Sequence, residues 1–190
     1  MKSTQLLLSM LLLSASSGWT QPAAQPAAVP AWQPSQRTDT AQTYSFARFT
    51  LPGRFANAPI GTSGNAPALT VDCIPGTPSH PKGRYLAAAI LVGPTLKIVY
   101  VEPEEIHGMS YYPKVDVRYR LDGAKDDERD QWSAGADKVS ASVPREVVKR
   151  ILRAHTLAIT VADEQGSRLQ VKFDLPSPTP VEQACNMDEP

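Results

Sequence analysis

The sequence predicts a mainly β fold, an antiparallel β-sandwich or barrel-like domain with one α-helix packed near 144–154. Three observations support this prediction. Several runs alternate apolar and polar residues with a period of two, one segment has the helical period, and two cysteines lie far apart behind an export signal. Together they indicate a single exported domain whose sheet carries one helix and one disulfide.

The first 18 residues have the features of a secretory signal peptide. Lys2 precedes an apolar run from Leu6 to Leu13, and small residues follow at 14–18. The run is too short to span a bilayer. We therefore expect a signal peptide at 1–18, a periplasmic or secreted location, and no integral membrane segment after cleavage.

Residues 19–42 are rich in Pro, Ala and Gln and contain little that could be buried. This composition predicts a disordered linker. Trp32 is the exception, and we interpret it as an incidental exposed aromatic; the alternative is an anchor for a partner or for the domain itself. The single disulfide-closed β domain is expected at 43–186, followed by a tail at 187–190.

The first strands are predicted from short apolar runs, Phe46–Leu51 and Leu69–Ile74. The next two runs, Tyr85–Val92 and Leu96–Val101, are apolar on both faces and meet at Gly93-Pro94. This pattern predicts two buried central strands joined by a turn.

A period of two is clearest from 115 to 122, where apolar residues occupy the odd positions and polar residues the even ones. The polar positions are Asp116, Arg118, Arg120 and Asp122. Segments 157–161 and 169–175 alternate similarly, and turn residues lie between them at 163–166, so we expect an antiparallel hairpin. Trp132 is predicted to be a core aromatic.

Residues 144–154 have the period of a helix laid on a sheet. Val147, Val148 and Ile151 fall on one face. Pro144 suits the first turn, and basic residues near the end favour the negative pole of the helix dipole. A second short helix is expected at 180–184, directly before Cys185.

Cys73 and Cys185 are the only cysteines of the chain. In an oxidising compartment we expect them to form one disulfide, and a loop of about 100 residues corresponds to roughly 4 to 5 kcal/mol of stabilisation. The alternative, a reactive thiol at Cys73, requires an activating histidine.

Motifs for catalysis or metal binding are not found, so we predict a non-enzymatic protein with no catalytic residues, no metal and no cofactor. Segment 61–64 lacks the Gly-x-Ser-x-Gly spacing, and the three histidines form no His-Glu-x-x-His motif. The acidic residues of 126–130 lack the pattern of an EF-hand and are interpreted as a solvated hairpin tip. The 19 basic and 19 acidic residues balance, which argues against nucleic acid as a partner.

The segment from Glu102 to Pro113 is the predicted recognition site, because it is longer than a normal hairpin loop and carries amphipathic side chains. The candidate binding residues are Glu104, Glu105, His107, Tyr111 and Tyr112. The alternative is that the two tyrosines begin the next strand and pack on its flanks.

Several short motifs come in an order that resembles a known family. They are Leu69, Val71 and Cys73, then Tyr119-Arg120-Leu121-Asp122, Trp132, Ile151-Leu152-Arg153-Ala154, Leu157, Phe173-Asp174-Leu175 and Cys185. The chain thereby resembles the periplasmic domain family that includes the VasI-like proteins associated with type VI secretion, and more distantly the invasion-associated locus B proteins. The resemblance implies a small disulfide-closed β domain outside the cytoplasm that acts as an accessory rather than a catalyst.

Three functions follow as hypotheses. The first is a non-enzymatic exported accessory domain that binds a protein or a cell-wall component. The second is an inhibitor of an exogenous hydrolase of the lysozyme type, acting through a surface loop. The third is a hydrolase with an unrecognised site, which requires a pocket with convergent titratable groups.

Overall fold

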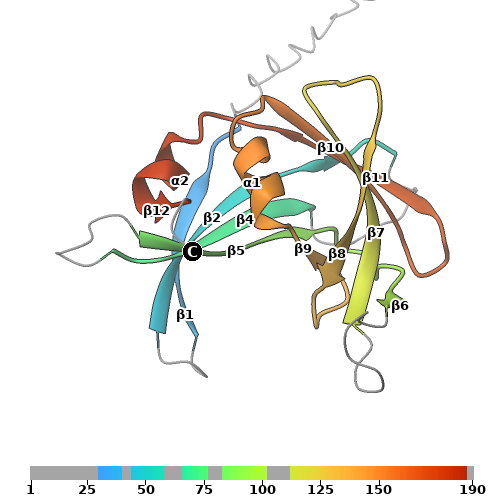
Figure 1. Ribbon diagram of the computed structural model, residues 1–190, viewed down its shortest axis with the longest axis horizontal. Helices are drawn as coiled ribbons and strands as arrows, with labels where there is room; N and C mark the ends of the chain where they lie inside the picture. The colour runs from blue at the N-terminus through green and yellow to red at the C-terminus, as the bar shows by residue number, and fades with distance from the viewer. Residues whose placement is uncertain (1–29, 40–43, 58–65, 77–82, 102–111, 188–190) are drawn as a thin grey trace, which may run out of the picture.

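The computed structural model describes residues 30–39, 44–57, 66–76, 83–101 and 112–187 (Figure 1). The predicted signal peptide and the first part of the predicted linker lie outside the described residues. So do residues 188–190 of the predicted tail.

The fold is mainly β, as predicted, with twelve strands and two short helices in the described part of the chain. The strands are β1 (Gln33–Asp39), β2 (Tyr44–Pro52), β3 (Arg54–Phe55), β4 (Ala68–Ile74), β5 (Gly83–Leu91), β6 (Val99–Val101), β7 (Tyr112–Leu121), β8 (Glu128–Ala134), β9 (Ser140–Ser142), β10 (Thr156–Ala162), β11 (Arg168–Asp174) and β12 (Cys185–Asn186). The helices are α1 (Arg145–Ile151) and α2 (Thr179–Ala184).

The strands form one sheet in the hydrogen-bonded order β1-β2-β4-β5-β9-β8-β7-β10-β11-β3. Pairing along this order is antiparallel; β6 joins β7 antiparallel, and β12 joins β5 in parallel. Figure 1 shows β1, β2, β4 and β5 on one side of the molecule and β7, β8, β10 and β11 on the other. Helix α1 lies between these two groups.

The two halves of the sheet are also connected by a nearly continuous stretch of chain. Only Gly53 separates β2, which pairs with β4, from β3, which pairs with β11. The Gly53 amide donates to the Pro67 carbonyl at 2.7 Å, and a Cβ on Gly53 would lie 2.5 Å from the Phe173 ring. A side chain does not fit there unless the Phe173 ring moves, so glycine permits β2 to continue directly into β3 while the sheet itself stays open.

The core lies on the face of the sheet where the odd-numbered residues of β7, β10 and β11 point. Trp132 is fully buried among them, as predicted, and its indole Nε1 donates to Asp130 at 3.0 Å. Helix α1 contributes Val147, Val148 and Ile151 to the same core. The opposite face of β7, β10 and β11 carries their even-numbered, mostly polar residues.

Cys73 and Cys185 form the predicted disulfide, with their Cα atoms 5.6 Å apart and a sequence separation of 112. Both cysteines are buried. Such a bond is typical of proteins in an oxidising compartment. Gly83 of β5 pairs with Cys185 and leaves room for the backbone carbonyls of Ile74 and Ala184.

Strand β1 differs from the sequence prediction, because it lies inside the segment expected to be a disordered linker. It pairs with β2 along its whole length, and Trp32, directly before it, is only 7% exposed. The expectation of an incidental exposed aromatic is therefore wrong, and Trp32 packs against the domain itself. The apolar contact of Trp32 with the core offsets the entropy that is lost when the polar residues of β1 become ordered.

The prediction of two buried central strands at Tyr85–Val92 and Leu96–Val101, joined by a turn, is right for the first run and wrong for the second, because β6 covers only Val99–Val101 and is not buried. Strand β5 pairs with β4, β9 and β12, whereas β6 pairs with β7. Gly93 has a φ of 98°, and Leu96 beyond it is buried in a bridge to Asp163 rather than beside β5. The second apolar run therefore crosses to the β10–β11 turn.

Candidate functional site

The predicted recognition segment can be placed only in part. Glu104, Glu105, His107 and Tyr111 lie outside the described residues. Tyr112 begins β7 opposite Val101 and is 52% exposed, and Tyr100 in β6 is 62% exposed. Tyr112 thus starts the next strand, but it remains open to solvent.

A different surface brings charged residues together. It lies on the face of β3, β11, β10, β7 and β8 that points away from the core, which we call the outer face. One row across this face runs from Arg54 through Lys172 and Ala158 to Arg120. Each residue of the row stands directly opposite the next, so their side chains project to the same side. Three of the four carry a positive charge.

The neighbouring row contains a second pair of cations. Thr160 of β10 stands opposite Arg118 of β7, which stands opposite Arg129 of β8. Like charges in directly opposed positions destabilise a sheet. We call the surface formed by Arg54, Lys172, Arg120, Arg118 and Arg129 the cationic face.

The cationic face is hollowed at two places. The first hollow, of about 220 Å³, is lined by Arg54, Arg120 and Lys172 together with Asp174, so its charged lining carries three cations and one carboxylate. The second, of about 550 Å³, lies over β7 and β8 and is lined by Arg118 and Arg129 together with Asp116 and Asp130, so its charged lining carries two cations and two carboxylates.

Strand β10 forms the floor between these cations. Its outward residues, Thr156, Ala158 and Thr160, are small, whereas the outward residues of β7 and β11 beside them are long. Short side chains flanked by long ones leave a depression along the strand. The two threonine hydroxyls add neutral hydrogen-bonding groups to this floor.

Acidic neighbours neutralise only part of the charge. Asp174 accepts a bidentate contact from Arg54, and this hydrogen bonding holds the pKa of Asp174 below its usual value. Arg120 lies 3.9 Å from Asp127, while Asp116 accepts a hydrogen bond from Gln131 at 2.9 Å. Arg118, Arg129 and Lys172 form no ion pair with another described residue.

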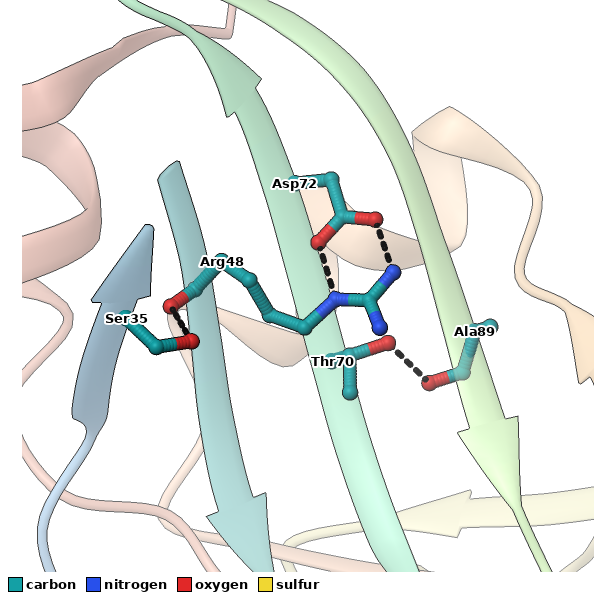
Figure 2. A network of polar contacts seen from close by, with 5 residues as sticks. All are labelled: Ser35, Arg48, Thr70, Asp72 and Ala89. Carbon is teal, nitrogen blue, oxygen red and sulfur yellow. Dashed lines mark hydrogen bonds and ion pairs between the residues drawn. The ribbon is translucent and has the colours of Figure 1, made fainter. Parts of the chain in front are cut away.

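A second polar network lies on the other half of the sheet and is structural. Arg48 donates through Nε and Nη2 to the two oxygens of Asp72, both at 2.7 Å, as Figure 2 shows. The Asp72 side chain is 11% exposed, and the Arg48 guanidinium lies 5.5 Å from the centre of the Phe46 ring. The Arg48–Asp72 pair connects β2 to β4, and its two charges compensate each other.

The interpretation of 126–130 as a solvated hairpin tip holds for Asp126 and Asp127, which are exposed between β7 and β8. It is incomplete for the other two acidic residues. Glu128 and Asp130 belong to β8. Glu128 forms an ion pair with Arg150 of α1 and accepts a hydrogen bond from Tyr119 at 2.8 Å. These contacts attach the helix to the sheet.

The disulfide borders a third hollow, of about 210 Å³, lined by Lys149, Arg153 and Glu182 among others. Cys185 reaches it, but its sulfur is bonded to Cys73, so a reactive thiol is excluded in this structure. Within the described ranges, groups of three or more potential metal ligands do not occur.

The described helices include none that is long and apolar enough to span a membrane. No protein-family model, curated protein or solved structure matches this chain. The cationic face is therefore interpreted from its own geometry.

Proposed function

We propose that this chain is a non-enzymatic accessory domain, exported to the periplasm or the cell exterior, that binds an acidic cell-wall component through its cationic face. The observation that carries the proposal is the direct opposition of Arg118 and Arg129, next to the row of Lys172 and Arg120. An anionic partner would relieve the repulsion that this arrangement imposes on the free protein.

Two further features support this proposal. The cations belong to paired strands of a disulfide-closed domain, so their backbone positions are set before binding and only their side chains have to be ordered. The overall charge is balanced, so the attraction is local and does not require a generally basic protein.

Cosedimentation with an insoluble bacterial cell-wall fraction tests the proposal. We expect the exported, oxidised chain to bind at 50 mM NaCl and to be released at high salt, since salt screens exposed charges. The double substitution Arg118→Gln/Lys172→Gln should weaken binding by about tenfold or more, because charge-assisted hydrogen bonds are lost.

Arg37→Gln is the matched control, because Arg37 is an exposed cation on β1, at the far end of the strand order. It should leave binding unchanged. Failure of the unmodified chain to sediment with the wall, or equal binding by both variants, would overturn the proposal. Thermal unfolding of each variant establishes that it is folded.

Inhibition of a lysozyme-type hydrolase stays a second candidate. The exposed Tyr100 and Tyr112 favour a contact at the β6–β7 end of the domain. An assay in which micromolar protein leaves lysozyme activity unchanged would remove it.

A further inference from the structure

We infer that the first hollow of the cationic face is a site for a single phosphate group, which the cell-wall component carries as a monoester. This inference rests on the proposed function and specifies the anionic group that the partner presents. It follows from the net charge of the hollow, from the placement of its three cations and from the small residue between them.

The charged linings of the two hollows differ in their balance. The first hollow carries three cations and one carboxylate, Asp174, which is a formal excess of two positive charges. In the second hollow two carboxylates balance two cations. Asp127 lies outside the lining of the first hollow, 3.9 Å from Arg120, and a long, partly exposed pair of this kind contributes little. An anion is therefore attracted to the first hollow rather than to the second.

Lys172 and Arg120 stand on the two sides of this hollow. They flank Ala158 in one row across the sheet, two strand spacings apart, or about 10 Å between their Cα atoms. Each side chain is long enough to lean over the alanine, whose methyl group leaves the space above it open. Both cations can thus donate to one oxyanion from opposite sides.

Arg54 supplies the third cation, next to Lys172. The two residues stand directly opposite each other on β3 and β11, an arrangement in which like charges repel. Asp174 accepts hydrogen bonds from both Nη1 and Nη2 of Arg54, which fixes the guanidinium at the edge of the hollow. A guanidinium has more N–H groups than these contacts use, so Arg54 can still donate to an anion.

A terminal phosphate matches this hollow better than a carboxylate does. It carries about two negative charges at neutral pH and has one acceptor oxygen for each of the three cations. A carboxylate carries one negative charge and has one oxygen fewer. The Thr156 hydroxyl and the Gly123 backbone also line the hollow and provide neutral donors.

Backbone amide shifts of the exported, oxidised chain test the site at about pH 8, above the second pKa of a phosphate monoester. Methyl phosphate is the monoester probe, dimethyl phosphate the diester with a single charge, and acetate the carboxylate. Methyl phosphate should shift the amides of Gly123 and Ala158 saturably. It should bind at least about tenfold more tightly than either of the other two probes, because it forms more charge-assisted hydrogen bonds.

Two variants test whether the anion occupies the hollow itself. Lys172→Gln removes one cation and should weaken methyl phosphate binding by about tenfold or more. Ala158→Leu fills the space above the floor without changing any charge, and it should also weaken binding. Arg37→Gln is the matched control and should leave the affinity unchanged. Thermal unfolding of each variant establishes that it is folded.

The cell-wall fraction connects the site to its partner. Treatment of the wall with a phosphomonoesterase should remove most of the binding, and free methyl phosphate should release the protein from untreated wall. Binding of methyl phosphate without any binding to the wall would overturn the proposed function, whereas the phosphate site itself would stand.

Three results would overturn the inference. They are equal affinity for the three probes, an unchanged affinity of Ala158→Leu for methyl phosphate, and undiminished binding to the phosphatase-treated wall. In each case, salt-sensitive binding to the wall that Arg118→Gln/Lys172→Gln weakens would leave the proposed function standing. Absence of binding to the wall and to every probe would overturn both.

Discussion

Glu128 connects three parts of the domain through one carboxylate. It pairs with Arg150 of α1 and accepts the hydroxyl of Tyr119 in β7, and these contacts lower its pKa from an ordinary 4.5 to about 2. Arg150 also lies over the Tyr119 ring, 5.9 Å from its centre. The helix is thus positioned by one partly exposed charge cluster as well as by its apolar face.

The substitution Glu128→Gln should lower stability in a pH-dependent way. Since the folded-state pKa is depressed, the carboxylate stabilises the fold above about pH 4.5, and this contribution is lost as pH falls toward 2. The loss should stay below about 1 kcal/mol at pH 7, because the pair is half-exposed and screened by solvent. Urea unfolding at pH 7 and pH 2 measures it.

Glu146→Gln is the matched control, because Glu146 contacts Lys149 on the same helix but is 79% exposed. It should have a smaller effect at either pH. A Glu128→Gln penalty that is as large at pH 2 as at pH 7 would contradict the assignment.

The individual cations of the site were visible in the sequence, but their proximity was not. The period of two places Arg118 and Arg120 on the polar face of their strand. Their opposition to Arg129 and their place near Lys172 depend on which strands are neighbours, which a single alternating pattern does not specify. The balanced total charge also gave no indication of the local excess of positive charge on this face.

At the level of elements, Gly83 shows how closely β5 approaches the C-terminal segment. A Cβ there would lie 2.1 Å from the carbonyl oxygen of Ile74 and 2.6 Å from that of Ala184. Both contacts involve backbone atoms, which cannot rotate away as a side chain can. Glycine is thus required where β4, β5 and the end of α2 converge.

Gly83→Ala should therefore destabilise the domain by about 2 kcal/mol or more, the cost of overpacking a site with little freedom to move. Gly166→Ala is an informative comparison: Gly166 has a φ of +84° but open space around it, so only backbone strain of about 1 kcal/mol is expected. Urea unfolding of both variants with the disulfide intact separates the effects. A smaller loss for Gly83→Ala than for Gly166→Ala would contradict this explanation.

Elements with strong local patterns were predicted well, and those that depend on distant partners were not. The β10–β11 hairpin and α2 lie where their patterns indicate, and α1 ends three residues earlier than expected. Strand β1 is polar and contains Pro34, so its composition indicates a linker; pairing with β2 and burial of Trp32 override that tendency. The turn at Gly93 predicts a change of direction but not the strand reached afterwards.

At the level of the whole molecule, the disulfide joins the first half of the sheet to the end of the folded chain. Breaking it by Cys73→Ala/Cys185→Ala should lower the free energy of unfolding by roughly 4 to 5 kcal/mol, as expected for a loop of about 100 residues. Guanidinium unfolding measures the loss. The unmodified chain under reducing conditions is the control, and a change below about 1 kcal/mol in both would contradict the stabilising role.

The continuity of β2 and β3 through Gly53 affects how the domain can come apart. In a flat sheet, strands can detach one by one from either edge. Here, β3 pairs with β11 and is continuous with β2, which pairs with β4. The edge strand β3 is therefore connected directly to the opposite half of the sheet. Separation of β3 from β11, beside the cationic face, is therefore opposed by the pairing of β2 with β4 in the other half of the sheet.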